Sequence, residues 1–351
     1  MTNHPRMLAE WEPQGAVMMA WPHHGTDWAR RLPQALSVFD AIARAVLQYQ
    51  NLIVSCEDVF SVQNLQRHFD RLCQEQSLPG RALLLPAPSN DTWARDFGPL
   101  AVAVGRRIRL LDFSFNGWGG KYPFSKDNAV NSHLARQNAF GRHRLKAVDW
   151  VLEGGSLETD GQGTLLSTRH CLMNPSRNGQ VSQEELEQTL HQHLGLERFL
   201  WLDHGALEGD DTDGHIDTLA RFCSPSRIAY VRCDDPGDSH YPELQAMEAQ
   251  LQGFRQSDGR PYELFPLPWP DAIYSKEGER LPATYANFLI LNKAVLVPVY
   301  DVPQDREALE VLGQCFPGRD IVPVLCRTVI EQHGSLHCLT MQLPEGVWGH
   351  E

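Results

Sequence analysis

The chain has 351 residues, enough for one large domain or two ordinary ones, and its 42% hydrophobic and 21% charged residues are typical of a soluble globular protein. Its formal net charge of −13 argues against nucleic acid and anionic membrane surfaces as partners, and is compatible with a cationic ligand. The longest apolar runs fall far short of a bilayer span, and residues 1–6 lack the layout of an export signal, so we expect a cytoplasmic protein.

In chain order, short apolar runs bounded by turn signals predict strands that alternate with helices. The predicted strands are residues 15–22, 51–54, 83–85, 100–104, 108–113, 151–156 and 218–222. The predicted helices are residues 33–48, 58–76, 182–195, 242–253 and 304–314. One of these helices starts with a capping box from Ser182 to Glu185 and stops at Gly195. We expect a single α/β domain over residues 1–351, built of strand–helix–strand modules, without an internal repeat in residue identity.

The eight cysteines are scattered, and none forms a Cys-x-x-Cys pair. This pattern suits neither a zinc ribbon nor the disulfide framework of a small secreted protein. We therefore expect most of the cysteines to be reduced, buried and unreactive, and a chemically active one must be recognised by its neighbours.

An acidic turn with a histidine, GDDTDGHID at residues 209–217, leads directly into the predicted strand 218–222. If the strand geometry extends back to His215, the side chains of His215 and Asp217 project on the same side. A histidine beside a carboxylate can bind a cation and move a proton next to it, although a solvated Asp-rich turn is an equally good interpretation. A calcium loop of the EF-hand kind fails on register, because its closing glutamate would fall on Ala220.

Three further residues carry chemically useful groups close to glycine and to predicted strands. Cys338 lies in the apolar–polar run 333–341, read as a strand, which would turn His337 to the opposite face and make it a poor base. Asp96 could simply pair with Arg95, Glu153 could be a turn residue, and Cys338 could be a buried structural thiol. Together with His215 and Asp217, however, they make one cysteine, one histidine and three carboxylates.

This set of groups suits covalent attack on a planar cation. Carboxylates grip a guanidinium bidentately, because its N–H donors lie in a rigid plane. The guanidinium carbon is a poor electrophile, so a thiolate is a better nucleophile for it than an alcohol. Expelling ammonia then requires a proton donor, the following hydrolysis requires a base, and a histidine can serve as both.

Eight segments follow one another nearly from end to end of the chain: AEWEP at 9–13, MAWP at 19–22, NDTWARDFGP at 90–99, FNGWGG at 115–120, LEGGS at 152–156, DTDGHID at 211–217, YANF at 285–288 and HCLT at 337–340. With these motifs in this order, the chain resembles the agmatine deiminase family, within the guanidine-modifying enzymes that share the pentein fold.

The resemblance implies a five-bladed α/β propeller of pseudo-fivefold repeated modules, with the active site on the axis and no cofactor or metal. It implies that Cys338 forms a covalent thiouronium adduct and that His215, oriented by Glu153, acts first as acid and then as base. Asp96 and Asp217 would hold the guanidinium. The expected reaction converts agmatine to N-carbamoylputrescine and ammonia, a step of putrescine and polyamine biosynthesis.

The distal part of the site is expected from charge and apolar surface. A diamine-like substrate needs a second anionic region, which the stretch EGDD at 208–211, including Asp211, can supply from the rim. Trp93 and Trp118, in predicted loops, could cover the methylene chain or simply pack beneath those loops. No arginine in these motifs obviously offsets the acidic rim, so a free arginine carboxylate should be repelled.

Two departures from the family pattern leave alternatives open. The family often has Gly-Gly-Asn-Ile-His before the cysteine, where this chain has HGSLH at 333–337, and Val-Asp-Asn after the histidine, where it has IDT at 216–218. Bacterial peptidylarginine deiminases look like the same family, so peptidyl-arginine is the near alternative substrate. A metallohydrolase using His215 with Asp211, Asp213 and Asp217 would need more histidine ligands. A non-catalytic guanidine-binding protein and a homo-oligomer also stay open.

Overall fold

The structure, a computed structural model, describes residues 4–349, and its strands form five small sheets. In the order in which their strands pair, the two four-stranded sheets are β17 (Thr340–Pro344), β2 (Gln14–Ala20), β3 (Asn51–Cys56) and β4 (Ala82–Pro86), and β1 (Pro5–Met7), β5 (Leu100–Val104), β6 (Arg107–Ser114) and β7 (Leu145–Val151). In the same order of pairing, the three three-stranded sheets are β10 (Arg198–Leu202), β9 (Thr164–Thr168) and β8 (Glu158–Thr159); β11 (Ala220–Ser224), β12 (Arg227–Arg232) and β13 (Glu263–Pro268); and β14 (Leu289–Ile290), β15 (Ala294–Val299) and β16 (Asp320–Leu325).

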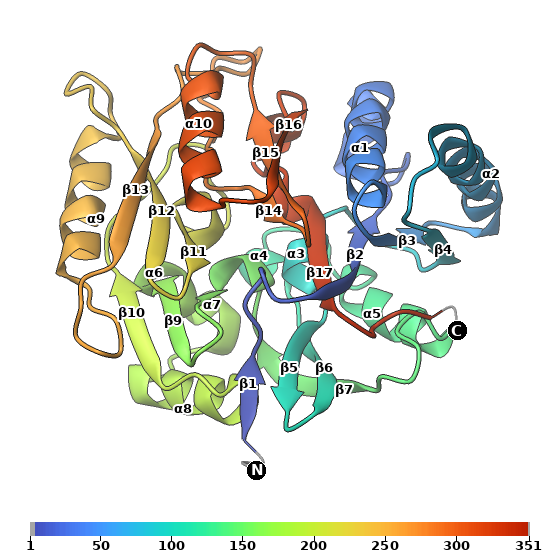
Figure 1. The fold of residues 1–351 in the computed structure, drawn as a ribbon, viewed down its shortest axis with the longest axis horizontal. Helices are drawn as coiled ribbons and strands as arrows, with labels where there is room; N and C mark the ends of the chain where they lie inside the picture. The colour runs from blue at the N-terminus through green and yellow to red at the C-terminus, as the bar shows by residue number, and fades with distance from the viewer. Residues whose placement is uncertain (1–3, 350–351) are drawn as a thin grey trace.

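Every sheet repeats one module. A first strand pairs antiparallel with a second, a helix crosses over, and a third strand pairs parallel with the second. The longer helices are α1 (Leu32–Leu47), α2 (Val59–Gln76), α5 (Asp127–Arg136), α8 (Gln183–Leu194), α9 (Tyr241–Gly253) and α10 (Asp305–Cys315). The two ends of the chain share one module, because β17 from the end of the chain pairs with β2 from its beginning (Figure 1).

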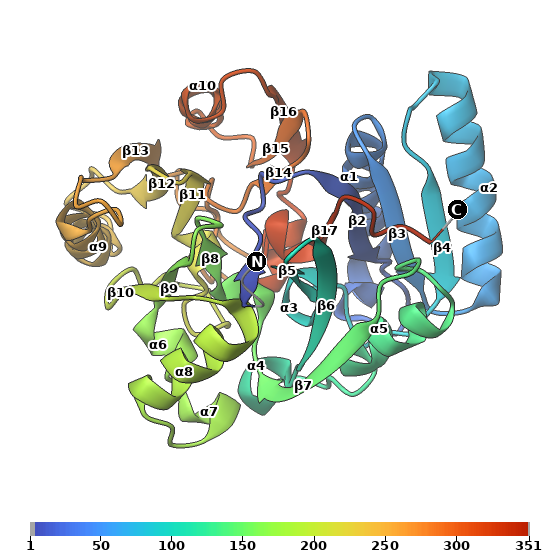
Figure 2. The same cartoon turned by 60° about the horizontal axis from the view of Figure 1, so that its bottom comes forward.

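The sheets lie around a common centre in both views, so the expected five-bladed α/β propeller is confirmed (Figures 1 and 2). One buried apolar cluster runs through all five modules. The repeat is one of architecture and not of residue identity, which is why comparing residues along the chain does not reveal it.

A short turn precedes the first strand of each module and faces the centre. The turns are α3 (Ala94–Phe97) before β5, η2 (Gly154–Ser156) before β8, η3 (Ile216–Thr218) before β11, residues 285–288 before β14, and η5 (His337–Leu339) before β17. Turn α3 contacts both η2 and η5, and η2 contacts η3. The repeat therefore brings segments from four distant parts of the sequence into contact.

The predicted helices agree with the structure, including the capping box at Ser182 and the left-handed cap at Gly195. Three predicted strands are wrong where they overlap the central turns. In the predicted strand 151–156, residues 154–156 form a 3-10 turn, and the predicted strand 218–222 starts only at Ala220, after the 3-10 turn 216–218. In the predicted strand 333–341, the observed strand starts only at Thr340. A single 3-10 turn is too short for a recognisable period, and its apolar residues resemble a buried strand.

Helix α5 was not predicted, since half of its buried face is polar. The side chains of Asp127 and Asn131 are buried beside Val130 and Leu134, and Asn131 donates to the Phe97 carbonyl. This replacement of apolar by polar positions weakens the helical pattern. Within residues 4–349, no helix is long and apolar enough to cross a membrane.

Candidate active site

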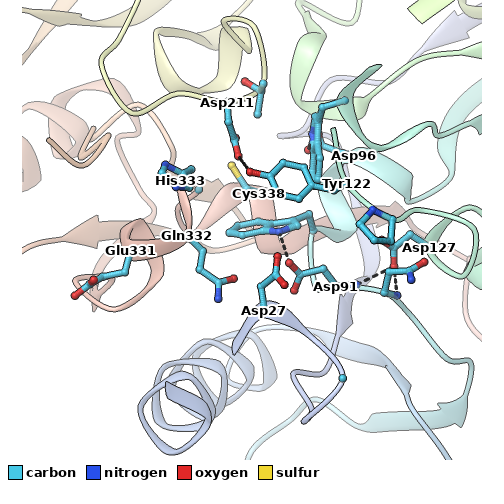
Figure 3. Close-up of a pocket in the computed structure, with 17 residues that line it drawn as sticks. Asp27, Asp91, Asp96, Tyr122, Asp127, Asp211, Glu331, Gln332, His333 and Cys338 are labelled. Carbon is cyan, nitrogen blue, oxygen red and sulfur yellow. Dashed lines mark hydrogen bonds between the residues drawn. The ribbon is translucent and has the colours of Figure 1, made fainter. Parts of the chain in front are cut away.

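A cavity of about 270 Å³ is lined by residues of two central turns, Asp96 of α3 and Cys338 of η5, and by residues of the surrounding loops (Figure 3). Five of the eight predicted site residues line it: Trp93, Asp96, Trp118, Asp211 and Cys338. The other three, Glu153, His215 and Asp217, are almost completely buried and reach the cavity wall through Asp96 and Cys338.

Cys338 occupies turn η5, where its thiol points toward a ring of polar groups. The Sγ atom lies 3.8 Å from Asp217 Oδ2 and 3.3–3.4 Å from the side-chain amide of Asn287. Burial raises the pKa of the Cys338 thiol well above its usual range, and the charges of Asp217 and Asp96 raise it further. Without a bound cation, this cysteine is therefore a neutral thiol.

His215 sits between two carboxylates. Its Nε2 is 3.2 Å from Glu153 Oε2, and its Nδ1 is 3.5 Å from Asp96 Oδ1 but has no hydrogen-bond partner among the described residues. Burial alone would lower the pKa of His215. The charge of Asp96, the neighbouring Cys171 and the hydrogen bond with Glu153 outweigh burial and raise it well above the usual value. The raised pKa favours the imidazolium form of His215, which can donate a proton.

Asp96 and Asp217 converge on Gly155. A Cβ atom added at Gly155 would lie 2.8 Å from Asp96 Oδ1, 3.2 Å from Asp217 Oδ2 and 2.5 Å from His215 Nδ1, so any side chain there would collide with the site. Arg95, considered as a partner for Asp96, instead points toward the His337 carbonyl. The two carboxylates lie close enough together to hold one planar cation.

The two carboxyl groups have different electrostatics. Burial raises the pKa of Asp96 to about 6, with Asp217 adding to this effect and His215 opposing it. Burial would also raise the pKa of Asp217, but its contact with His337, at 2.7 Å, and nearby positive charges lower it overall. Asp217 Oδ1 has no hydrogen-bond partner within residues 4–349 and is free to accept one.

Three further residues support the site, although the sequence suggested no role for them. Arg177 donates from Nε to Glu153 Oε1 at 3.0 Å and from Nη2 to the Thr212 carbonyl at 2.9 Å. Asn287, in the YANF motif, bonds the backbone N–H of His337 at 2.8 Å. His337 is not turned away on a strand as predicted, because residues 337–339 form a 3-10 turn and its ring contacts Asp217.

The outer part of the cavity is acidic. Asp211 Oδ2 accepts a hydrogen bond from Tyr122 Oη at 2.8 Å, and burial raises the pKa of Asp211. Trp93 donates from Nε1 to Asp91 at 3.0 Å, and Trp118 donates from Nε1 to Asp96 at 3.0 Å. Among the described residues, the wall contains six carboxylates and no lysine or arginine: Asp27, Asp91, Asp96, Asp127, Asp211 and Glu331.

The possible metal ligands named from the sequence, His215, Asp211, Asp213 and Asp217, do not form one cluster in the structure. Asp213 pairs with Arg177 and Lys121, and Asp211 is held by Tyr122. In the part of the chain that the structure describes, the cluster with metal-ligand spacing is Glu153, Cys171 and His215. The Arg177 guanidinium bonded to Glu153 places a fixed positive charge beside any cation there.

Over nearly its whole length, the chain is similar to known deiminases. The family model of Porphyromonas-type peptidyl-arginine deiminase matches residues 6–344. An agmatine deiminase of Ectopseudomonas mendocina is 33% identical over 372 aligned residues, covering 98% of each chain. A solved structure described as a candidate arginine deiminase of Porphyromonas gingivalis is 46% identical, with a TM-score of 0.90 over 98% of this chain and 99% of that chain.

A second solved structure is that of C. jejuni agmatine deiminase, in a variant with serine in place of a cysteine and with substrate bound. It is 34% identical, with a TM-score of 0.89 over 98% of this chain and 97% of that chain. Agreement over nearly the whole length establishes the architecture as the pentein fold.

Proposed function

Because the chain belongs to the Porphyromonas-type peptidyl-arginine deiminase family, we propose that it is an agmatine deiminase whose residues 1–351 act as one catalytic domain. The observation that carries this proposal is the convergence of a cysteine, a histidine–glutamate pair and two aspartates at the base of one acidic cavity. The reaction replaces one guanidine nitrogen of agmatine by oxygen and yields N-carbamoylputrescine and ammonia.

In this proposal, Asp96 and Asp217 bind the guanidinium and thereby activate the nucleophile. Their negative charges raise the pKa of the Cys338 thiol, so a bound cation that neutralises them lowers it. The thiol proton is released as the cation binds, and the substrate itself makes the thiolate available. This thiolate then attacks the guanidinium carbon and forms a neutral tetrahedral adduct.

His215 carries the proton through the remaining steps. The imidazolium donates its proton to one nitrogen, ammonia leaves, and a thiouronium cation remains on Cys338. Neutral His215 then takes a proton from water, whose oxygen attacks the thiouronium carbon. The second adduct breaks its C–S bond, the hydroxyl proton returns to sulfur, and the ureido product is released. Glu153, itself bonded by Arg177, keeps the imidazole in place throughout.

The charge of the cavity favours agmatine over arginine. A substrate with an ammonium at its far end meets Asp211, while a free arginine would bring a carboxylate among several others with no described lysine or arginine in the wall to bind it. Trp93 and Trp118 line the cavity between the two ends and offer apolar surface for the methylene chain. Peptidyl-arginine is the alternative substrate of the same chemistry.

The test is ammonia release from agmatine, free arginine and a blocked arginine peptide, measured side by side. We expect agmatine to be strongly preferred, and the preference over arginine to shrink as salt is added, since salt screens exposed charge. Equal turnover of agmatine and the blocked peptide would favour the peptidyl alternative. Binding of agmatine without ammonia release would favour a non-catalytic guanidine-binding protein.

Asp96 gives the reaction a dependence on acid pH. Only the ionised carboxylate attracts a guanidinium, and its pKa is raised to about 6. We therefore expect kcat/KM for agmatine to fall as the pH drops through about 6, approaching about tenfold per pH unit well below that value. In the Asp96→Asn variant, the residual activity should lack this decline. A kcat/KM of the wild type that stays constant from neutral pH to pH 5 would contradict this assignment.

A further inference from the structure

We propose that His333 is a specificity-determining residue, which together with Asp211 binds the ammonium group at the far end of the substrate. This inference deepens the proposed function and rests on it. It starts from the backbone of His333, which has φ 66° and ψ −1°, the left-handed conformation that favours glycine. A histidine there costs about 1 kcal/mol relative to a residue in the right-handed region.

Residues with this kind of backbone strain gather at the cavity. Two of the six non-glycine residues with positive φ in residues 4–349 line it, Trp118 and His333, and a third, Asp213, belongs to the loop beside it. Strained conformations of this kind persist where the surroundings enforce them, and they concentrate at functional sites. The strained backbone of His333 therefore points to a functional role for its side chain.

The side chain is fixed in one tautomer. Its Nδ1 lies 2.8 Å from the carbonyl oxygen of Gly209, and a carbonyl only accepts hydrogen bonds, so Nδ1 carries the proton. In the neutral ring, Nε2 is then an acceptor, and no other described residue bonds it. The ring lines the cavity, so this acceptor is available to a bound molecule.

The segment around His333 is held in place on both sides. Gly334 packs so closely on Trp93 that an added Cβ atom would lie 2.2 Å from its Cζ3 atom. On the other side, the bond to Gly209 ties His333 to the loop that carries Asp211. Figure 3 shows His333 and Asp211 at the same side of the cavity, across from Asp127.

The two groups complement an ammonium. Asp211 supplies negative charge and an acceptor, and Tyr122 holds this carboxylate by its hydroxyl. His333 supplies a second, neutral acceptor from another direction, so two of the three N–H donors of an ammonium find partners. Neither group offers a matching donor for the carboxylate of free arginine while His333 is neutral.

The test compares agmatine with pentylguanidine, in which a methyl group replaces the ammonium. The variant is His333→Gly, which gives the backbone the residue it favours and should fold at least as stably as the wild type. We expect the ratio of kcat/KM for agmatine over pentylguanidine to fall about 10- to 100-fold, the effect of one lost hydrogen bond to a charged group. The kcat/KM for pentylguanidine should change little.

The control is Ser77→Gly, which makes the same relief of a positive φ at the end of α2, outside the cavity, and should leave the ratio unchanged. An unchanged ratio in His333→Gly, or an equal loss for both substrates, would overturn the role of His333 alone. A wild type that deiminates neither compound would instead contradict the proposed function and this inference together.

Discussion

Replacing Cys338 with serine should abolish measurable deimination, with kcat falling by at least about 10⁴-fold, as expected when a nucleophile is lost. The physical reason is ionisation. Burial and the charges of Asp217 and Asp96 raise the pKa of the Cys338 thiol, and in the proposed mechanism a bound cation that neutralises these charges lowers it. An alcohol in the same surroundings loses its proton far less readily, and its oxygen cannot form the thiouronium adduct.

Further measurements separate a loss of covalent chemistry from a loss of the fold. Circular dichroism should show an unchanged fold, because serine is nearly isosteric with cysteine. In the wild type quenched with acid during turnover of agmatine, mass spectrometry should find an adduct of agmatine minus ammonia on Cys338. The wild type should lose activity with iodoacetamide, be protected by agmatine and tolerate EDTA. The matched control is Cys73→Ser, a partly exposed cysteine on α2, which should keep full activity. Normal turnover by Cys338→Ser would exclude the mechanism.

The parts of the fold that follow from the sequence are those whose apolar residues repeat with a regular spacing. Helix α1 and helix α8 keep apolar residues at helical spacing, and their start and stop residues lie where the sequence places them. The central turns could not be predicted in this way. His215 and Asp217 were placed on one face of a strand, whereas His215 precedes a 3-10 turn that contains Asp217. They come together because of the turn and its neighbours η2 and β9, and not because of strand alternation.

The same distinction applies to the site. The residues proposed to react were chosen from their chemistry and from the resemblance, because a cysteine, a histidine and several carboxylates near glycine are visible in the chain itself. The supporting contacts of Arg177 and His337 were not predicted, because each depends on a partner elsewhere in the sequence. Arg177 bonds Glu153, 24 residues earlier, and His337 contacts Asp217, 120 residues earlier. The fold of a single module brings Arg177 to Glu153, whereas the arrangement of different modules around the centre brings His337 to Asp217.

The Asp217→Asn variant should lower kcat/KM for agmatine by about 10²- to 10³-fold, corresponding to about 3–4 kcal/mol for breaking a buried charge pair. Asp217 is fully buried, its pKa is lowered, and one of its oxygens has no partner among the described residues. An ionised carboxylate with a free acceptor is well suited to hold one edge of a guanidinium. Asparagine keeps the shape but removes the charge, and its amide can direct N–H donors at the cation. The matched control is Asp203→Asn, which removes a carboxylate from an exposed pair with Arg169 and should change kcat/KM little.

The same variant should make Cys338 more reactive toward a neutral reagent, in the direction opposite to its loss of activity. The Asp217 carboxylate raises the pKa of the Cys338 thiol, so removing this charge lowers the pKa and increases the thiolate fraction at a given pH. Without substrate, iodoacetamide should therefore alkylate Cys338 faster in Asp217→Asn than in the wild type, most clearly at alkaline pH, as followed by mass spectrometry of the peptide containing Cys338. A merely structural effect of the substitution would lower activity without this gain. Slower or unchanged alkylation in a folded variant would show that Asp217 does not control the ionisation of Cys338, and the activation of the thiol by a bound cation would then need another source.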